Sequence, residues 1–587
     1  MGVCFPDAKD VLGLGVGMDL PWGTDAQQGF VRDPGGADQL APHVRRFLEL
    51  QTPSGASWSH VFFSIQPKDR GVPRLDRYAS AWDDAVRAMP PGATRALHTT
   101  ALDLGSVRPR LRGPLLELVN GLAERHGFSW VNEDVGLWSL GGKPLPYPLP
   151  PYLTDEGLEA CINNVRECQR ALSIPLLIEF PGFSPGVSLP IGPWDAYDYF
   201  RVLAEQTDSP VTLDVGHLLS WRWQMGHRGE DLYGDLDALP LTHCFEIHLS
   251  GCEIRSDALY DTHQGVLIEQ QFRLLDRLLA RCPNARAVTY EDPVIDADGR
   301  LRRKCRPSLE RLAARVERWV EGRVETPPIA PATRSEPTGV EMGSTRTSTK
   351  SASQVDAILQ SLVYDEGARQ RFLDGEVIGA QDLRHLFGEL DTRELTSLAE
   401  LTASTTLERA HAGVGRLETT FDAAFRAWRE LHGEGTSAQT SAKAMIRRFL
   451  AAEGRDVVEG MSEIPGPSVE ECFARFCIRE GLMNEAQADL TLARAITRAV
   501  AVCQEPGFTL PRGIERCAHG LRSVVWTEPP TLVALARGQV LEGAITPLIA
   551  DLLRGVPTDE AAERHRVAPP VARATSEELA RRGLASA

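Results

Sequence analysis

The sequence predicts a (β/α)8 barrel at residues 1–323, followed by a mainly α-helical domain at residues 354–587. In the first part, short apolar runs alternate with amphipathic helical patterns, which is typical of a parallel sheet covered on both faces. Residues 324–353 are rich in Pro, Ser, Thr and Gly, so they bury too little apolar surface to offset their ordering entropy and are predicted to form a flexible linker. Beyond them, helical periodicity prevails and strand signals are weak.

Eight apolar runs are the predicted strands of the barrel, and amphipathic stretches between them are the predicted helices. Eight repeats match the strand number of a (β/α)8 barrel, whereas a doubly wound sheet normally has fewer strands. The runs are 11–18, 60–65, 95–98, 129–132, 175–179, 210–214, 243–249 and 286–291, and the clearest helical stretches are 115–125, 154–172, 196–206 and 269–280.

Charge and composition exclude several classes of function. The 587-residue chain has 63 Lys and Arg against 80 Asp and Glu, a net charge of −17, so no general nucleic-acid surface is expected. No apolar run reaches the roughly 18 residues of a membrane span, and the N-terminus lacks a signal-peptide core. The 11 cysteines form no CxxC pairs, so we expect neither a zinc ribbon nor a disulfide framework. These features favour a cytoplasmic protein.

Carboxylate and imidazole side chains follow the predicted strands at their C-terminal ends. These ends converge on one mouth of a (β/α)8 barrel, where its active sites are built. Such groups are costly in a barrel interior unless they are paired or bound to metal. A mixed oxygen and nitrogen donor set suits iron, manganese or zinc, and a carboxylate can join two ions. The set is His98, Glu133, Asp134, Glu179, Asp214, His217, His248, Asp261, His263, Glu291 and Asp292.

Three other features have more than one interpretation. The glycines of residues 13–17 lack the spacing of a dinucleotide site and are expected to let the backbone turn at the barrel mouth. Residues 141–153 contain five prolines and are expected to form a lid or a wall of the pocket. Cys252 follows His248 by four residues and is either a soft ligand, a redox partner or an inert buried thiol.

A series of motifs resembles one known family over roughly residues 10–320. Residues 97–106, LHTTALDLGS, are similar to LHGVGLSLGS, residues 130–138 to SEHLxW, and residues 247–252 to IHLAGH. Further similar segments are 13–18, 147–179, 212–217, 261–263 and 290–292. In this order, the motifs resemble the DUF692 family of multinuclear non-haem iron-dependent oxidative enzymes, which includes the iron component of methanobactin biosynthesis.

The resemblance implies a barrel whose mouth holds two or three iron ions in ferrous and ferric states, with O2 as co-substrate. The metal ligands it implies are His98, Glu133, Glu179, Asp214, His217, His248, Asp261, His263 and Glu291, and the catalytic residues are Asp134, Asp261 and His263. The chain departs from the family pattern at Gln66, Lys68, Asp134, Phe180 and Cys252. Because Gln66 and Lys68 are poor ligands, we expect two irons rather than three.

The function implied is oxidative modification of a residue, with cysteine as one candidate, in a ribosomally synthesised precursor peptide. Residues 354–587 resemble more weakly the helical partner protein that recruits the peptide in this family. An unrelated domain that forms a homodimer is the alternative for this half. For the barrel, the alternatives are a xylose-isomerase-like isomerase or phosphodiesterase, and a degenerate barrel that serves as a scaffold without metal.

Overall fold

The computed structural model describes most of residues 5–584. The longer stretches outside the description are 20–29, 33–37, 66–71, 324–351, 377–391 and 458–464, and shorter gaps of one to four residues fall elsewhere. The linker prediction for residues 324–353 therefore lies almost wholly outside the described residues, as do Gln66 and Lys68.

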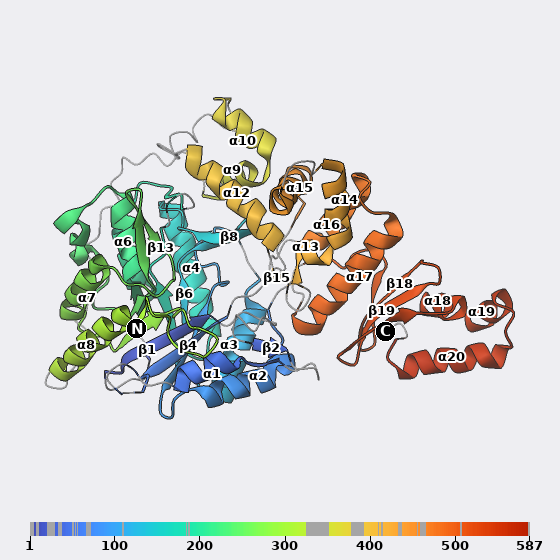
Figure 1. The fold of residues 1–587 in the computed structure, drawn as a ribbon, viewed down its shortest axis with the longest axis horizontal. Coiled ribbons are helices and arrows are strands. Elements are labelled where there is room, and N and C mark those ends of the chain that lie inside the picture. Colours follow the sequence, from blue (N-terminus) through green and yellow to red (C-terminus); the bar gives the residue numbers. More distant parts are fainter. Residues whose placement is uncertain are drawn as a thin grey trace.

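The N-terminal part is a closed barrel of parallel strands (Figure 1). Each predicted run overlaps one barrel strand, so the predicted fold class is confirmed. Pairing of β1 with both β4 and β14 closes the barrel, with Val16 opposite Val61 and Tyr290. The strands are β1 (Gly13–Asp19), β4 (His60–Ile65), β5 (Thr94–Thr99), β6 (Trp130–Asp134), β9 (Leu176–Glu179), β10 (Val211–Asp214), β11 (Cys244–Leu249) and β14 (Ala287–Glu291).

Helices on the outside cover the barrel. In α4, Leu158, Cys161, Val165 and Cys168 are buried at intervals of three and four residues, and Thr154 caps the helix by accepting a hydrogen bond from the Gly157 amide. These helices are α1 (Pro42–Glu49), α2 (Leu75–Ala88), α3 (Gly113–His126), α4 (Asp155–Ala171), α5 (Ala196–Thr207), α6 (Val215–Gln224), α7 (Glu269–Arg281) and α8 (Arg306–Arg323). Short strands β2 (Phe30–Arg32) and β3 (Asp38–Leu40) pair beside them.

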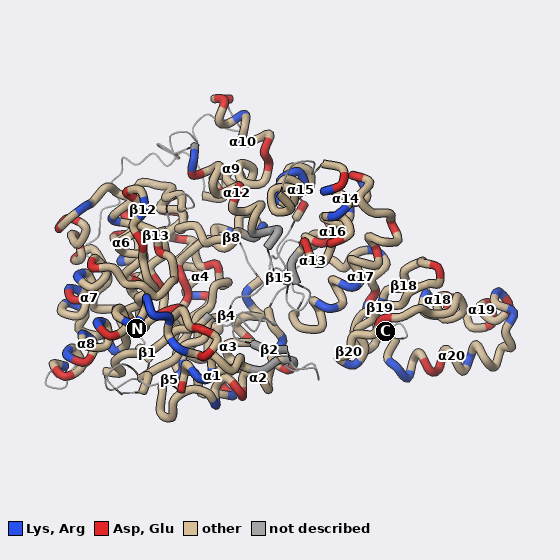
Figure 2. The backbone as a smooth tube through the Cα atoms, in the orientation of Figure 1, with Lys and Arg blue, Asp and Glu red and all other residues tan. Residues whose placement is uncertain are grey.

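Acidic and basic residues are interspersed along the outer helices α7 and α8 (Figure 2). Arg311 lies 2.7 Å from Glu269, and Arg315 lies 3.1 Å from Asp276, between these two helices. Exposed pairs of this kind contribute little stability, so the apolar face of each helix holds it on the barrel. Among the described residues, no helix combines the length and the apolar character needed to cross a membrane.

The interior of the barrel is layered because alternate residues of each strand point inward. A lower layer of Phe62, Trp130 and Leu177 is fully buried. The polar donors lie above it, toward the C-terminal ends of the strands. The glycine-rich residues 13–17 belong to strand β1 rather than to a turn, which corrects the expectation from sequence. A Cβ on Gly15 would fall 2.3 Å from the His60 ring, so these glycines leave room for inward side chains.

The proline-rich segment after β6 forms a β-hairpin of β7 (Leu137–Leu140) and β8 (Lys143–Leu149). Leu140 and Leu145 lie in one apolar cluster with Leu359 and Leu398 of the C-terminal half. The segment therefore joins the two halves of the chain.

Helices dominate the C-terminal half, as predicted, and they pack around a cluster of phenylalanines that includes Phe425, Phe449 and Phe473. The first two helices of this half are separated at Asp365, whose carboxylate caps the second by accepting a hydrogen bond from the Ala368 amide. The helices are α9 (Ala352–Tyr364), α10 (Glu366–Leu373), α12 (Thr392–Glu408), α13 (Leu417–Thr420), α14 (Asp422–His432), α15 (Ala438–Glu453), α16 (Val469–Arg479) and α17 (Glu485–Val502), with a small pair of strands, β15 (Ala410–His411) and β16 (Gly415–Arg416).

A four-stranded antiparallel sheet near the C-terminus was not anticipated from the sequence. The feature of the sequence that indicates this sheet is the two-residue turn Arg537-Gly538. Both turn residues have a positive φ, and the segments on either side of the turn pair as a hairpin. Val533 and Leu535 face the helices that precede the sheet, whereas Leu532 and Ala534 face those that follow it. The elements are β17 (Ile514–Cys517), β18 (Gly520–Val525), β19 (Thr531–Ala536), β20 (Gln539–Ala544), α18 (Pro547–Leu553), α19 (Thr558–Arg564) and α20 (Pro569–Arg581).

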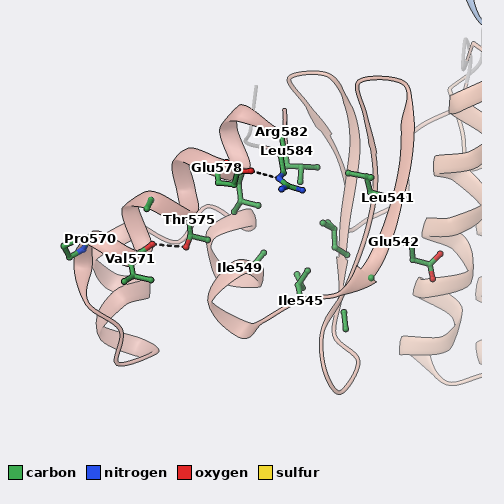
Figure 3. A pocket seen from close by; sticks show the side chains of 15 residues that line it. Leu541, Glu542, Ile545, Ile549, Pro570, Val571, Thr575, Glu578, Arg582 and Leu584 are labelled. Atoms are coloured by element: carbon green, nitrogen blue, oxygen red, sulfur yellow. Dashed lines mark hydrogen bonds and ion pairs between the residues drawn. The ribbon is translucent and has the colours of Figure 1, made fainter.

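An apolar groove lies between the edge strand β20 and the last helix, α20 (Figure 3). Leu541, Ile545 and Ile549 line one side, and Val571 and Thr575 of α20 line the other. Val571 is 52% exposed, so the groove is open to solvent.

Candidate metal centre

Among the described residues, ten side chains with oxygen or nitrogen donors converge at the C-terminal mouth of the barrel. They form five overlapping groups, and within each group the potential ligand atoms all lie within 4.8 Å of one another. Every residue predicted as a metal ligand except Glu133 is present in at least one group, and Asp134 and Asp292 join them. The donors are His98, Asp134, Glu179, Asp214, His217, His248, Asp261, His263, Glu291 and Asp292.

Glu179, at the end of β9, lies at the centre of the set. Its Oε2 is 3.1 Å from His98 Nε2 and 3.2 Å from His248 Nδ1, and its Oε1 is 3.9 Å from His217 Nδ1. The side chain is 1% exposed, so no bulk water shares these contacts. Its two oxygens face different imidazoles, an arrangement that suits a carboxylate bridging two cations.

Asp214 and His217 are held together by the start of α6. Asp214 ends β10 and caps the helix, with its Oδ1 accepting a hydrogen bond of 2.8 Å from the His217 amide. The Nδ1 of His217 is 2.7 Å from the carbonyl oxygen of Phe180, to which a protonated Nδ1 donates. This contact fixes the ring orientation and leaves Nε2 facing Asp261 Oδ2 at 3.2 Å.

His263 lies at the rim of the mouth and is held from two sides. Its Nδ1 is 2.7 Å from Asp292 Oδ2, and its Nε2 is 3.1 Å from Asp261 Oδ2. His263 and Asp292 both have a φ of 46°, a left-handed conformation that costs a non-glycine residue about 1–3 kcal/mol. Ser250 also donates to Asp261, at 2.7 Å. The surrounding loops thus hold two strained residues in contact at the entrance.

A second polar layer lies below the mouth, and sequence reasoning missed it. The carboxylate of Glu246 on β11 is 3.2 Å from His248 Nε2, and it accepts hydrogen bonds from Trp130 at 2.8 Å and from Asn132 at 2.9 Å. His60 Nε2 is 3.5 Å from the same carboxylate. Strand periodicity could have predicted it, because Glu246 and His248 are two residues apart on β11 and their side chains therefore point to the same, inward side.

The same alternation keeps Glu133 away from the donor groups. Trp130, Asn132 and Asp134 point inward from β6, so Glu133 points outward. There its carboxylate accepts hydrogen bonds from the amides of Leu102 at 2.9 Å and of Ala101 and Asp103 at 3.3 Å. The structure therefore places Glu133 where it holds the loop after β5.

Cys252 begins β12 (Cys252–Arg255) and pairs with Asp261 at the end of β13 (Ala258–Asp261). Its side chain is buried, and no described donor group of the mouth includes it. Burial, followed by the Asp261 and Asp214 carboxylates, raises the pKa of the thiol well above its ordinary value. A protonated thiol is a weak ligand, so this environment favours the inert interpretation in the metal-free protein.

The mouth concentrates negative charge in a buried space. Burial opposes protonation of His98, but the neighbouring carboxylates, Glu179 foremost, raise its pKa to about 10. Burial raises the pKa of Asp214 to about 6 and that of Glu291 to about 8, despite nearby imidazoles. Carboxylates outnumber imidazoles in the donor groups, so bound cations would relieve the repulsion that remains.

Two buried donor atoms give a direct test of whether this set fits a metal. Among the described residues, the Nδ1 of His98 and the Oδ2 of Asp214 have no hydrogen-bond partner. Buried polar atoms in proteins are nearly always satisfied, so orphaned atoms of this kind need an explanation such as an ion. Imidazole and carboxylate donors in this arrangement suit iron, manganese or zinc, and the residues present therefore fit a metal.

Comparison with known proteins finds similarity within the barrel. The model of the family described as RiPP precursor modification enzyme MbnB/TglH/ChrH matches residues 77–300. The barrel is similar to this family over these residues. The family name refers to enzymes that modify the precursors of ribosomally synthesised and post-translationally modified peptides.

Individual relatives match the barrel at moderate identity. A UPF0276 protein of Anaeromyxobacter sp. (strain Fw109-5) is 27% identical over 38% of this chain and 78% of its own length. One of Chromobacterium violaceum is 29% identical over 41% of this chain and 81% of its own length. A crystal structure of SacUVDE aligns with 51% of this chain and 98% of its own at 16% identity and a TM-score of 0.30, a likeness too low for any argument.

Proposed function

We propose that this protein is an iron- and O2-dependent oxidoreductase that modifies a residue of a precursor peptide at the barrel mouth, with a cysteine thiol as the first candidate. The observation that carries the proposal is the ring of strand-end donors around Glu179, in a barrel that is similar to the precursor-modifying family. Burying so many polar groups costs stability, and apolar side chains would stabilise the barrel better. The polar mouth therefore supports a functional role.

Two sets of residues would hold two irons. Asp214, His248 and Glu291 form one set with Glu179, and His217, Asp261 and His263 form the other. His98 also groups with Glu179 and His248. Asp134 groups with Glu179 and His217, so Glu179 links the two sets. Iron bound there would supply one-electron chemistry toward O2, which no side chain of this set provides by itself.

The remaining chemistry belongs to side chains at the entrance. Burial and the Glu179 carboxylate raise the pKa of Asp134, so its carboxyl holds a proton more readily than a free aspartate does. His263 is 36% exposed and is the donor residue nearest to bulk solvent, so it is placed to meet the peptide. We assign proton transfer to Asp134 and orientation of the substrate to His263 and Asp261.

The test is the metal content of protein purified anaerobically from iron-supplemented cells, combined with Mössbauer and EPR spectra. We expect about two irons per chain, as a two-metal site requires. His217→Ala and His248→Ala should each lose iron and peptide modification, whereas His565→Ala, in the C-terminal half beside Asp551, should change neither. Zinc or manganese alone would favour an isomerase or phosphodiesterase, and a metal-free barrel would favour a scaffold. Either result would overturn the proposal.

A further inference from the structure

Tyr147 of β8 brings a hydroxyl group to the barrel mouth, beside the candidate metal ligand His217. Gly182, in the loop after β9, shows how close the two side chains come. A Cβ on Gly182 would lie 3.2 Å from Cδ2 and Nε2 of the His217 ring and 3.4 Å from the hydroxyl oxygen of Tyr147. Because residue 182 is a glycine, the phenol and the imidazole can both approach this point.

The local sequence of β8 directs Tyr147 toward the mouth. The register of the β7–β8 hairpin shifts between Pro144 and Leu149, so Tyr147 lies in a bulge of β8. A bulge changes the direction of a side chain relative to a regular strand, and bulges are frequent beside active sites. Pro146 and Pro148 flank Tyr147, and a proline restricts the residue before it as well as its own backbone. The segment therefore limits the directions that the Tyr147 side chain can take.

The C-terminal half holds the hairpin that carries Tyr147. Lys143, at the start of β8, is 3% exposed, and its Nζ donates a hydrogen bond of 2.7 Å to the carbonyl oxygen of Val457. Leu145 lies in the same apolar cluster as Leu359 of α9. With its strand anchored in this way, Tyr147 is pre-organised at the mouth, as a residue that binds substrate needs to be.

The phenol supplies a kind of hydrogen bond that the donor groups of the mouth do not. Ionised carboxylates accept hydrogen bonds but donate none. An imidazole that binds a metal through one nitrogen can donate only from the other, and in His217 the Nδ1 already faces the Phe180 carbonyl oxygen at 2.7 Å. A backbone carbonyl of a peptide needs a donor, and the Tyr147 hydroxyl provides one without adding charge.

We propose that the Tyr147 hydroxyl donates a hydrogen bond to the backbone carbonyl of the peptide residue that is modified, and that it thereby positions this residue against His217 and Asp261. The inference rests on the proposed function, because the ligand of Tyr147 is the substrate of that reaction. The contact recognises the backbone and not the reacting side chain. A thiol that has no carbonyl group therefore gains nothing from Tyr147.

The experiment is anaerobic isothermal titration calorimetry of the full-length, iron-loaded chain with two thiols. The methylamide of N-acetylcysteine has the backbone carbonyls of a peptide cysteine, and ethanethiol has none. Tyr147→Phe should weaken binding of the capped cysteine about three- to ten-fold, the loss expected for one neutral hydrogen bond, and leave ethanethiol binding unchanged. Tyr233→Phe is the matched control and should bind both thiols as wild type does, because the Tyr233 ring packs against Arg277 of the outer helix α7.

The outcomes separate the hydroxyl contact from the proposed function. Equal binding of the capped cysteine by wild type and Tyr147→Phe would overturn the contact alone. An equal loss for both thiols would assign Tyr147 a structural role and would also overturn it. Binding that depends on Tyr147 in a wild-type barrel that holds zinc instead of iron would overturn the proposed function and support the contact. No binding of either thiol to the iron-loaded wild type would overturn both the contact and cysteine as the modified residue.

Discussion

His248 and Glu246 stand two residues apart on β11, and the Nε2 of His248 lies 3.2 Å from the Oε1 of Glu246. The contact occupies one ring nitrogen and leaves Nδ1 facing Glu179 and Glu291, at 3.2 Å and 3.6 Å. A carboxylate behind a histidine ligand fixes the ring orientation and increases the basicity of the nitrogen that binds metal. Glu246 is thus a positioning residue for the mouth.

Glu246→Gln should weaken metal binding about 10- to 100-fold, because the amide keeps the shape of the side chain but removes the charge behind His248. Competition with a chromophoric chelator measures the affinity, and circular dichroism checks the fold. Glu253→Gln, an exposed carboxylate on β12, is the control and should retain wild-type affinity. Equal affinities for wild type and Glu246→Gln would show that Glu246 serves packing only.

Metal uptake should release protons and strengthen as the pH rises. Neighbouring carboxylates raise the pKa of His98 to about 10, whereas an unfolded histidine has a pKa of about 6.5. Protonated His98 therefore stabilises the metal-free protein fully below pH 6.5, and that contribution disappears as the pH rises toward 10. Between pH 6.5 and 10, metal affinity should rise about ten-fold per pH unit for each proton that the metal displaces.

Isothermal titration calorimetry of metal binding, in buffers with different ionisation enthalpies, counts the released protons. His98→Gln should release fewer protons than wild type at pH 8. An affinity that does not vary between pH 7 and 9 would contradict a protonated His98 in the metal-free site.

Docking of the two halves should respond to pH through Asp356 of α9. Its carboxylate lies 2.9 Å from Arg108 Nε and accepts a hydrogen bond of 3.1 Å from the Tyr152 hydroxyl. Burial raises the pKa of Asp356 to about 6, even with Arg108 beside it. A raised pKa means that its protonated form favours the docked state, so the stability it contributes falls as the pH rises from about 4 through 6.

Hydrogen exchange in the β7–β8 hairpin and α9 reports the docking. Wild type should gain protection there as the pH falls from 7 to 5, after correction for intrinsic exchange rates. The gain should correspond to stabilisation of the docked state by about 1–3 kcal/mol. Asp356→Asn should lose this pH dependence, and Asp422→Asn, an exposed aspartate of α14, should retain it. The prediction fails if both variants keep the wild-type profile.

Gly15→Ala should destabilise the barrel by about 1–3 kcal/mol, the range for overpacked cores. The added Cβ would fall 2.3 Å from the His60 ring, which is held on its other side by a 2.7 Å contact to Thr289. Gly113→Ala is the control, because a Cβ there meets nothing within 4 Å. Urea unfolding measures the stability of both variants. Equal stability would show that the barrel interior accommodates the added methyl group at little cost.

The barrel could be predicted because strand periodicity and strand number are local properties of the sequence. Each of the eight predicted runs overlaps a strand, and the residues at the strand ends meet because parallel strands share one C-terminal edge. Glu133 and Glu246 show the limit of that reasoning. Both lie on correctly predicted strands, but only the inward or outward phase of the strand decides which carboxylate faces the histidines.

The sequence by itself determined the barrel, its donor-lined mouth and the helical character of the C-terminal half, because apolar periodicity is written in neighbouring residues. Only the tertiary structure decided which ring nitrogen of each histidine is available, that the β7–β8 hairpin joins the two halves, and that β20 and α20 enclose a groove. These relationships depend on contacts between residues far apart in the chain. Their geometry is fixed by packing, which no local pattern encodes.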